Sequence, residues 1–390
     1  MREILKKKIT VVTSSRADFG LLHSTINLLE KNPKFDLTLL VTGTHLEEKF
    51  GRTIDDIKKE NIQKIIELPI HLNSSNVMNV MSSMSEAFLR SGQYFEKDMP
   101  DLLILLGDRF EIFAFAQAAM FLKIPMAHIH GGELTEGAID EVIRHSLTKL
   151  SHLHFTSNEV HRDRVIQLGE DPERVFNVGA PGLDYIKSLQ FFSRKELSEN
   201  YNIKIKEKLF LVTYHPVTLD LTESRRGIEE LIFSMTKIQD ATIIWTMPNA
   251  DPDSDYIYNL LKQEESKNDD FYLYTNLGQK NYLSFLKNAT AVVGNSSSGI
   301  IEAPFLKVPT INIGSRQGGR MQAASIINAE PQSKSIDQAI DLICSKSFQE
   351  SLKNFKSLYG EGTAAEMILG ILEKTDFTKL IIKKFYDLKK

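Results

Sequence analysis

The sequence predicts an α/β protein built from two doubly wound parallel sheets. Short apolar runs alternate with longer runs of helical periodicity along a chain of 390 residues, and this alternation is typical of βαβ units. A chain of this length exceeds what one hydrophobic core usually supports, so two domains are expected. Polar and charged residues directly follow several apolar runs, at the strand ends where open parallel sheets bind ligands.

The apolar runs that we expect to form strands fall into two sets. In the first half they cover residues 9–13, 37–42, 64–68, 102–106, 125–129 and 153–157, with helices between them at 21–30, 78–95, 112–121 and 139–150. In the second half they cover 209–213, 242–247, 271–274, 289–293 and 310–313. Turn residues at 175–182 favour a hinge near 176–190. The expected domains are therefore 1–178 and 179–361.

Composition and charge exclude several classes of protein. Apolar residues make up 42% and charged residues 25%, which is ordinary for a soluble globular protein. The net charge of −4 gives no general attraction to nucleic acid. Cys344 is the only cysteine, which excludes an intrachain disulfide and a thiolate cluster. No run approaches the ~20 apolar residues of a membrane span. We expect a cytoplasmic protein without nucleic-acid or membrane partners.

The first predicted strand-to-helix turn argues against a dinucleotide cofactor. Residues 13–18 contain no G-x-G-x-x-G, and without those glycines the backbone cannot approach a pyrophosphate in the usual way. The turn carries Arg16 and Asp18 instead, and the guanidinium of Arg16 suits contact with a phosphate. We therefore expect no NAD.

Charged residues follow two strands of the first half. Asp108 and Arg109 come just after the run 102–106, where a helix cap or a local ion pair would explain them equally well. Asp140 and Arg144 are spaced i, i+4 on the predicted helix 139–150 and could form an ordinary surface pair. Because Glu133 lies nearby in the sequence, we expect instead that Arg144 holds the carboxylate of Asp140 at the rim of a binding site.

Histidines recur in pairs in this half, at positions 128 and 130 and at 152 and 154. A His-x-His pair on each of two neighbouring strands could bind a metal ion, but carboxylate ligands at matching spacing are missing. A histidine within a strand more often forms a structural hydrogen bond. We expect only His130, the last residue before two glycines, to face the site, and we expect no metal.

Ligand-type residues also follow consecutive strands of the second half. Each one alone is an ordinary turn or capping residue, but together they suit a ribose diphosphate. Glutamate binds ribose hydroxyls, serines and the N–H groups of a helix start bind phosphate, and arginine or histidine binds the diphosphate charge. The residues concerned are His215, Asn249, Ser296, Ser297, Glu302 and Arg316.

Several motifs together resemble the hydrolysing UDP-N-acetylglucosamine 2-epimerases of sialic-acid biosynthesis. They are Leu106-Gly-Asp-Arg109, His128-Ile-His-Gly-Gly-Glu133, Ile139-Asp140 with Ile143-Arg-His145, Gly294-Asn-Ser-Ser-Ser-Gly299 and Ile313-Gly-Ser-Arg-Gln317. The similarity extends from 14–18 to 360–365, nearly the whole chain. It implies a GT-B fold, with two Rossmann-like domains, the nucleotide in the cleft between them, and C-terminal helices 362–390 joining the first domain.

The resemblance also implies a reaction: UDP-N-acetylglucosamine and water give N-acetylmannosamine and UDP, through elimination to 2-acetamidoglucal and without a cofactor. Many relatives carry Glu where this chain has His130, so Glu133 or His130 itself could take that acid–base role. The expected catalytic residues are Asp108, His130, Glu133, Asp140 and His215. The expected substrate-binding residues are Arg16, Asp18, Arg109, Arg144, His215, Asn249, Leu277, Ser296, Ser297, Glu302 and Arg316.

Three alternatives stay open at this point. One is the same chemistry on a UDP-2,4-diacetamido-2,4,6-trideoxyglucose, as in the legionaminic acid pathway. A second is a GT-B glycosyltransferase, which would need an acceptor site. A third is a UDP-sugar binding protein without catalytic activity.

The C-terminal segment has apolar residues at helical spacing, namely Phe377, Ile381, Phe385 and Leu388, with lysines around them. This pattern predicts an amphipathic basic helix, which can bind a membrane surface. A helix this short more plausibly docks on the first domain or on a neighbouring subunit. We expect a homo-oligomer, most simply a dimer, because closed twofold assemblies are the commonest.

Overall fold

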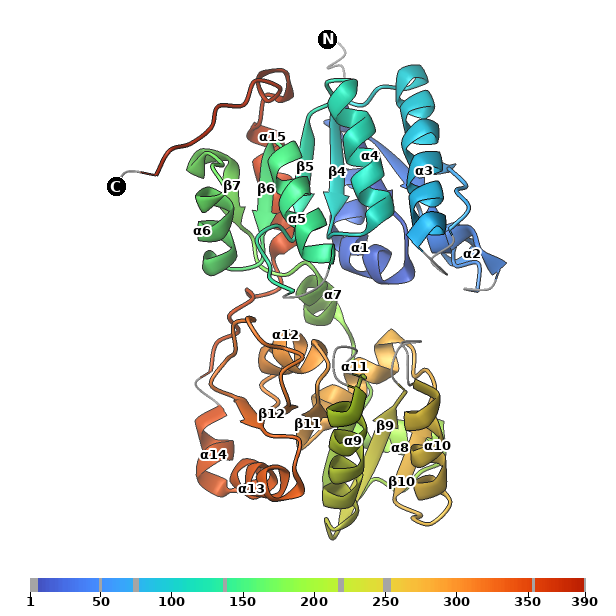
Figure 1. Ribbon diagram of the computed structural model, residues 1–390, viewed down its shortest axis with the longest axis vertical. Coiled ribbons are helices and arrows are strands. Elements are labelled where there is room, and N and C mark those ends of the chain that lie inside the picture. The colour runs from blue at the N-terminus through green and yellow to red at the C-terminus, as the bar shows by residue number, and fades with distance from the viewer. Residues whose placement is uncertain are drawn as a thin grey trace. The chain divides into compact units, whose positions relative to one another are not determined.

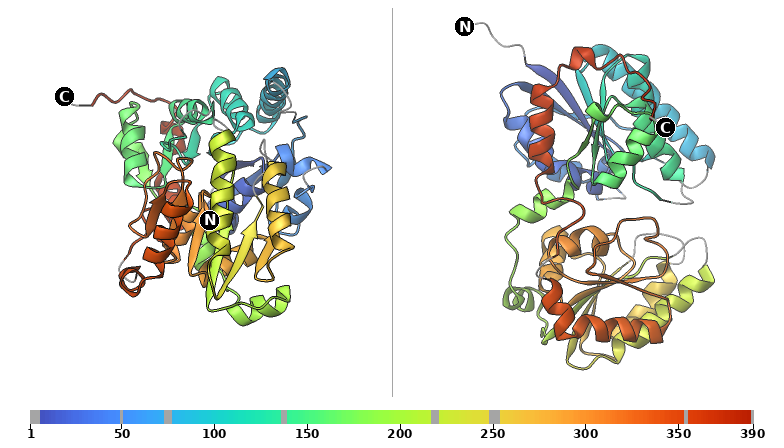
Figure 2. Two further views of the ribbon diagram at one scale, coloured as in Figure 1. Left: turned by 60° about the horizontal axis from the view of Figure 1, so that its bottom comes forward. Right: turned by 90° about the vertical axis from the view of Figure 1, so that its left-hand side faces the viewer.

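The computed structural model describes residues 6–48, 51–72, 77–135, 139–216, 221–247, 254–352 and 355–388. The chain forms two compact units, Met1–Lys187 with Tyr359–Lys390, and Ser188–Leu358 (Figure 1). Each unit contains one sheet of parallel strands that is flanked by helices (Figure 2). The predicted fold class, two Rossmann-like doubly wound sheets, is confirmed.

The sheet of the first unit has seven strands among the described residues, in the order β3-β2-β1-β4-β5-β6-β7. All neighbouring pairs are parallel. The order reverses between β1 and β4, which makes their carboxyl ends the switch point where such sheets bind ligands. The strands are β1 (Lys7–Thr13), β2 (Phe35–Val41), β3 (Ile65–Glu67), β4 (Leu102–Leu106), β5 (Met126–Ile129), β6 (Leu153–Thr156) and β7 (Val175–Asn177).

Helices cover both faces of this sheet, which is why its central strands are apolar on both sides. On one face α1 (Arg16–Lys31) and α15 (Ala364–Lys374) pack around Ile9 and Val11. On the other face α3 (Val77–Lys97), α4 (Phe110–Phe121) and α5 (Ile139–Leu150) pack around Leu103 and Leu105. The remaining helical segments are η1 (Gly43–Leu46), α2 (Ile54–Ile57), α6 (Glu159–Gln167), η3 (Pro172–Arg174) and α7 (Gly182–Ser188).

The helix α15 returns to the first unit after the whole second unit. Its first turn is held by Asp184 of α7, whose carboxylate accepts hydrogen bonds from the backbone N–H groups of Ala364 at 3.0 Å and Ala365 at 2.6 Å. Two otherwise unsatisfied donors at the start of the helix are thereby capped. The first unit also extends past the expected boundary at 178, because it includes most of α7.

The second unit repeats the architecture with six strands in the order β10-β9-β8-β11-β12-β13. Its switch point lies between β8 and β11. The strands are β8 (Lys208–Thr213), β9 (Ala241–Thr246), β10 (Phe271–Tyr274), β11 (Ala291–Gly294), β12 (Thr310–Ile313) and β13 (Ile326–Ala329). The helices are α8 (Arg194–Tyr201), α9 (Leu221–Thr236), α10 (Ser254–Glu265), α11 (Gln279–Asn288), α12 (Ser298–Phe305), α13 (Ser333–Cys344) and α14 (Lys346–Ser351).

Two strands were not predicted from the sequence. The segment 175–182 was expected to be a turn, but Val175–Asn177 forms β7 and pairs with β6 before Gly179 turns the chain at φ +86°. The segment Ile326–Ala329 forms β13 and pairs with β12. Turn residues at 179–182 directly follow the first of these segments and hid its strand character in the sequence.

The predicted C-terminal helix is wrong. A single 3₁₀ turn, η5 (Phe377–Lys379), is present, and residues 380–388 have no helical structure. The guanidinium of Arg174 donates to the carbonyl oxygens of Leu380 at 3.0 Å and Ile382 at 3.1 Å, and the backbone N–H of Tyr386 donates to Gly169 O at 2.9 Å. These backbone groups bond to the first unit, where a helix would have bonded them to one another.

A half-buried lysine holds the same segment in place. The ammonium of Lys383 donates to the carbonyl oxygens of Lys149 at 2.6 Å and Ser151 at 2.8 Å, and it pairs with Glu170 at 3.0 Å. Burial alone would raise the pKa of Glu170, but bonds from His154 and the two lysines lower it to about 2. The tail therefore docks on the first unit, as one of the two expected options, through these polar groups and through the buried side chains of Phe377 and Leu380.

In the part of the chain that the structure describes, no helix combines the length and the apolar run needed to cross a membrane. The expected cytoplasmic location stays a prediction.

Candidate active site

The polar residues of the first unit gather because β1, β4, β5 and β6 are consecutive neighbours in the sheet. Parallel strands end at one edge, so the residues that follow them lie along that edge. Asp18 belongs to the segment after β1, Asp108 and Arg109 follow β4, and His130 follows β5. The strand-end rule therefore brings these four predicted residues to one edge of one sheet.

Arg144 joins two of the strand ends. Its side chain is buried, and it forms an ion pair with Asp108. It also donates to Glu133 O at 2.8 Å and to the hydroxyl of Thr135 at 2.9 Å. The expected pairing with Asp140 is wrong. Helical side chains lean toward the N-terminus of their helix, and here that direction carries Arg144 onto the β5 turn and the end of β4.

Asp140 lies in the first turn of α5 and is exposed to solvent. Partial loss of hydration, followed by the negative charge of Asp108, raises the pKa of the Asp140 carboxyl, and the charge of Arg144 opposes the shift. Two carboxylates that share a region resist ionising together. The raised pKa makes Asp140 a candidate proton donor.

Asp18 and Arg109 lie at the switch point between β1 and β4. Asp18 is buried and accepts a hydrogen bond from the Ser14 hydroxyl at 2.8 Å. Burial raises the pKa of Asp18, and the charge of Arg109 opposes it. Arg109 pairs with the buried carboxylate of Glu111, so part of its charge is already neutralised. Arg16, the first residue of α1, is exposed.

His130 and Glu133 form a close pair at the end of β5. His130 Nδ1 lies 2.6 Å from Glu133 Oε1, and the side chains are 13% and 12% exposed. His130 has φ +70°, a left-handed conformation that is uncommon outside glycine. Such strained residues often serve a function, because the surrounding structure must hold them in place. The sequence suggested each residue separately but did not predict this pair.

The other three histidines of this region have structural partners. His128 Nε2 lies 2.7 Å from Gly107 O, and His152 Nδ1 accepts from the backbone N–H of Met126 at 3.1 Å. His154 Nε2 lies 3.0 Å from Glu170. Across the described ranges, no three His, Cys, Asp or Glu side chains are arranged to hold a metal ion.

In the second unit one asparagine connects three strand ends. Asn295, just after β11, accepts from the backbone N–H of His215 at 2.7 Å and donates to His215 O at 2.9 Å. Its own carbonyl oxygen accepts from Arg316 at 3.0 Å and from Gln317 at 2.8 Å. His215 follows β8 and Arg316 follows β12, so both expected residues are brought to the switch point.

His215 is largely neutral near pH 7. Burial, followed by the positive charge of Arg316, lowers the pKa of His215 to about 4. A neutral imidazole can accept a proton or donate a hydrogen bond without adding charge to the site. Asn295 and Gln317 were not on the expected list, although both belong to the motifs on which the family resemblance rests.

The start of α12 carries the serines that were expected to bind phosphate. Ser297 is its exposed N-cap residue, and the backbone N–H of Ser298 donates to Ser296 Oγ at 3.4 Å. The N–H groups of Gly299 and Ile300 donate to the carbonyl oxygens of Ser296 and Ser297, so a phosphate that binds here would replace these bonds, helped by the helix dipole. Ser296 precedes this turn, and Glu302 lies about one turn into the helix. Burial raises the pKa of Glu302, and the Ser298 hydroxyl opposes the shift.

Two expected residues remain, and the structure describes one of them. Leu277 is a buried residue between β10 and α11, and its carbonyl oxygen accepts from Tyr201 at 3.3 Å and Asn281 at 2.9 Å. Asn249 lies outside the described residues.

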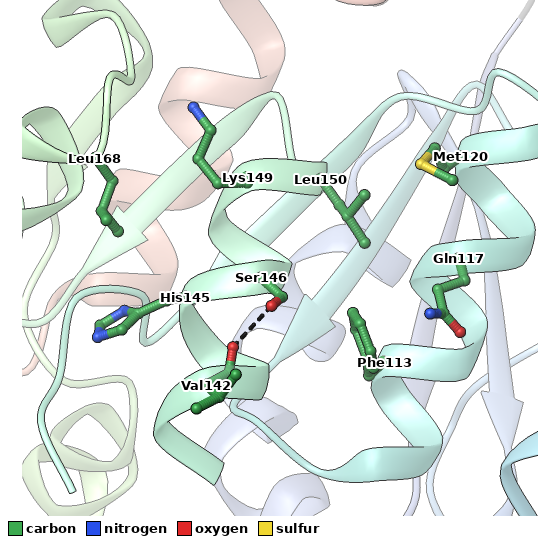
Figure 3. Close-up of a pocket in the computed structure, with 9 residues that line it drawn as sticks. All are labelled: Phe113, Gln117, Met120, Val142, His145, Ser146, Lys149, Leu150 and Leu168. Carbon is green, nitrogen blue, oxygen red and sulfur yellow. Dashed lines mark hydrogen bonds between the residues drawn. The ribbon is translucent and has the colours of Figure 1, made fainter. Parts of the chain in front are cut away.

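Two apolar hollows lie elsewhere on the first unit. One, of about 540 Å³, lies between α4 and α5 and is lined by residues that include Phe113, Met120 and Val142 (Figure 3). The other, of about 830 Å³, lies between α3 and α4. No residue of the expected site lines either hollow. We therefore place the candidate site at the strand ends and not at these hollows.

Comparison with known proteins agrees with the motifs. A family model described as UDP-N-acetylglucosamine 2-epimerase matches residues 27–373. A Campylobacter jejuni protein named GDP/UDP-N,N′-diacetylbacillosamine 2-epimerase (hydrolyzing) is 40% identical over 89% of this chain and 90% of its own. The Escherichia coli polysialic acid biosynthesis protein P7 is 37% identical over 98% of both chains.

A solved structure supports the fold. The UDP-GlcNAc 2-epimerase from Neisseria meningitidis, bound to UDP-GlcNAc, has a TM-score of 0.75 and 17% identity. The match covers 94% of this chain and 100% of that one. The matched family model spans most of the chain. The two relatives are each more than one third identical to this chain over most of its length. This chain belongs to the UDP-N-acetylglucosamine 2-epimerase family.

Proposed function

We propose that this protein is a hydrolysing 2-epimerase that converts UDP-N-acetylglucosamine and water to N-acetylmannosamine and UDP. The observation that carries the proposal is the cluster of Asp108, His130, Glu133 and Arg144 at adjoining strand ends in a chain of this family. Epimerisation at C2 needs groups that remove and return a proton, and this cluster supplies them.

The first step is an elimination. A base removes the proton from C2, the electron pair of that C–H bond forms the C1=C2 double bond, and the C1–O bond breaks as UDP leaves. We assign the base to the His130–Glu133 pair, in which a carboxylate contacts an imidazole at 2.6 Å. Hydrogen-bond donors that face the diphosphate stabilise its developing charge.

The second step adds water to the 2-acetamidoglucal. A proton is delivered to C2 from the opposite face, and the oxygen of the water bonds to C1 and releases its proton to solvent, which yields the 2-epimeric free sugar. We assign the acid to Asp140, whose raised pKa favours the protonated form, with Asp108 beside it. Asp18, Arg16, Arg109 and Arg144 are the proposed sugar- and phosphate-binding groups of this unit.

The nucleotide is assigned to the second unit. Ser296, Ser297 and the N–H groups at the start of α12 are proposed to bind the diphosphate, with Arg316 and His215 beside it. Glu302 is proposed to bind the ribose hydroxyls, since a carboxyl that holds its proton can donate as well as accept. Asn249 and Leu277 stay predicted contacts.

A second substrate is favoured by a specific observation. The relative from Campylobacter jejuni, at 40% identity, is named for a diacetylbacillosamine sugar. The elimination and hydration would be the same on that substrate, because C1 and C2 are unchanged. The two candidates differ at C4 and C6 and not at the reacting carbons.

Proton NMR of the products tests the function. The protein is incubated with UDP-N-acetylglucosamine alone and, in parallel, with the UDP-2,4-diacetamido sugar alone. Free UDP with N-acetylmannosamine is expected from the first, and faster release from the second would reassign the substrate. Deuterium incorporated at C2 from D₂O would confirm the elimination. No turnover of either sugar in the absence of an acceptor would contradict the proposal and favour a transferase.

Replacement of Arg316 by Ala should weaken UDP binding by roughly 10-fold or more, because a charged donor to the diphosphate is lost. Isothermal titration calorimetry with UDP alone measures the effect. The control is Arg226→Ala, which removes an exposed arginine of α9 in the same unit. Equal UDP affinity of both variants would place the nucleotide elsewhere.

We also propose that the chain forms a homo-oligomer, most simply a homodimer. Large apolar side chains are exposed along α3, α4 and α5, among them Met81, Leu89, Phe121 and Val142. Contiguous exposed apolar surfaces of this kind often mark protein interfaces. Light scattering should give a mass that is a multiple of the 44.3 kDa chain.

Truncation after Lys374 should lower the melting temperature by roughly 5 °C or more. It removes the buried side chains of Phe377 and Leu380 and the Lys383–Glu170 pair. The mass by light scattering should not change, because these contacts lie within one chain. The exposed neighbour provides a control, and Lys384→Ala should melt like the parent. An unchanged melting temperature after truncation would contradict the docking of the tail.

A further inference from the structure

A chain of hydrogen bonds at the end of β6 leads to the His130–Glu133 pair. Its members are Asn158, His161, Ser157 and Glu133, and all four are buried. Asn158 Nδ2 lies 3.4 Å from His161 Nε2, and His161 Nδ1 lies 2.8 Å from Ser157 Oγ. Ser157 Oγ lies 3.2 Å from Glu133 Oε1.

The backbone determines the direction of this chain. Asn158 is the N-cap of α6, and its Oδ1 accepts from the backbone N–H of His161 at 2.9 Å. That bond assigns the amide, so Nδ2 is the group near His161 and can only donate. His161 Nε2 must then be the acceptor nitrogen, which leaves the ring proton on Nδ1.

The directions of the other two hydrogen bonds follow because His161 has one ring proton and Ser157 has one hydroxyl proton. His161 Nδ1–H donates to Ser157 Oγ, so the single hydroxyl proton of Ser157 is free to point at Glu133 Oε1. Burial lowers the pKa of His161 to about 4, which keeps the ring neutral and the direction unchanged near pH 7. Every donor in the chain therefore points toward Glu133.

The same carboxylate oxygen receives the bond from His130. Glu133 Oε1 is 2.6 Å from His130 Nδ1, and a carboxylate can only accept, so His130 carries a proton on Nδ1. His130 Nε2 is buried and has no hydrogen-bond partner among the described residues. Nε2 is thus the nitrogen left to exchange a proton with a ligand.

We infer that Ser157 and His161 are positioning residues that hold Glu133 as an acceptor and thereby direct His130 to exchange its proton through Nε2. The inference rests on the proposed function only for the identity of the ligand. Two arginines flank the group: Arg144 donates to Glu133 O at 2.8 Å, and Arg164 donates to Gly132 O. Both arginines contact the backbone of this turn, and Ser157 is a neutral donor to Oε1.

The turn at Gly132 and the first turn of α6 approach each other closely, which fixes the position of Glu133 relative to Ser157. Gly132 has φ +84°, and a Cβ at this position would lie 2.3 Å from His161 O. The turn that carries His130 and Glu133 is therefore packed directly on the first turn of α6. Any larger residue at 132 would push Glu133 away from Ser157.

Nitrogen NMR of histidine-labelled full-length protein tests the directions independently of activity. Long-range proton–nitrogen spectra at neutral pH should show both His130 and His161 protonated at Nδ1, with assignments from His130→Asn and His161→Phe. A His161 ring protonated only at Nε2, or a His130 ring that lacks the Nδ1 proton, would overturn the inference.

Kinetics test the positioning role. Ser157→Ala should lower kcat about tenfold, the effect expected from one lost hydrogen bond to a charged group, with KM within about twofold. Ser157→Thr keeps the hydroxyl and should recover most of kcat. The control is Ser151→Ala, a buried serine whose hydroxyl has no partner in the described structure.

The outcomes separate the two proposals. An unchanged kcat in Ser157→Ala, or an equal loss in Ser151→Ala, would overturn the positioning role. A parent protein that turns over neither UDP-sugar but shows both Nδ1 protons would overturn the proposed function and leave the direction of the hydrogen bonds standing.

Discussion

The variants Asp140→Asn and Glu133→Gln should each lower kcat by ~10²–10⁴-fold, the usual effect of losing a proton-transferring group. Asp140 is exposed and lies at the start of α5, so the Asp140→Asn variant should fold like the parent protein. Glu133→Gln keeps the shape of the side chain but removes the charge beside His130. UDP affinity by calorimetry should change little, because the nucleotide is assigned to the second unit.

Asp108→Asn should lose turnover as well, because the substitution affects both the site and the stability of the fold. It removes the ion-pair partner of the buried Arg144 guanidinium, and an unpaired buried charge costs stability. Its melting temperature should therefore fall, which distinguishes it from Asp140→Asn. The control for all three is Asp163→Asn, which changes an exposed carboxylate on α6. Turnover at the parent rate in Asp140→Asn and Glu133→Gln would contradict the assignment.

The pH dependence should identify the acid. A carboxyl with a raised pKa delivers its proton only below that pKa, so activity that depends on Asp140 should decline as the pH rises through it. In Asp140→Asn the residual activity should lack this decline. A decline that persists unchanged in the variant would assign the acid to another group.

Gly294→Ala should be the most destabilising single-methyl change at the second sheet. Gly294 has φ +130° at the end of β11, and a Cβ there would lie 1.9 Å from Thr213 O of the neighbouring strand. Relief of that clash must separate β11 from β8 or distort the turn, at about 3 kcal/mol of unfolding free energy or more. The same turn carries Asn295, so UDP affinity should fall with stability.

A second glycine with a positive φ provides a comparison without the clash. Gly314 follows β12 with φ +71°, and a Cβ there would meet nothing within 4 Å. Gly314→Ala should therefore cost only the left-handed conformation, about 1 kcal/mol. Urea unfolding of the two variants measures the difference. Equal losses would show that contact with Thr213 O is not what requires glycine at 294.

Most of the sheet architecture could be predicted from the sequence, because the signals are local. The runs 102–106 and 310–313 and the helix 139–150 are the same in prediction and structure. Their apolar periodicity reflects burial on both faces of a parallel sheet. The edge strands β7 and β13 were missed, whereas the equally short edge strands β3 and β10 were predicted.

The site could be predicted only as a set of positions. The strand-end rule placed Asp108, His130 and His215 correctly at their sheet edges, because parallel strands share a direction. It could not say which groups touch. The partner of Arg144 depends on where α5 crosses the β5 turn, and the role of Asn295 depends on the neighbouring β8.

The structure of the C-terminal segment also could not be predicted from local sequence patterns. Its apolar spacing predicts a helix, since helical hydrogen bonds form within the segment itself. Arg174, Gly169 and Glu170 lie about 200 residues away in sequence and offer its backbone and Lys383 other partners. No pattern inside the segment can show that competition.

The sequence by itself therefore determined the fold class, the family and the strand ends that carry the polar residues, because each depends on local periodicity or on short motifs. Only the tertiary structure decided the pairings: Arg144 with Asp108, His130 with Glu133, and Ser157 with both Glu133 and His161. Hydrogen bonds and ion pairs act over about 3 Å, and the residues that reach that distance are selected by how helices cross neighbouring strands.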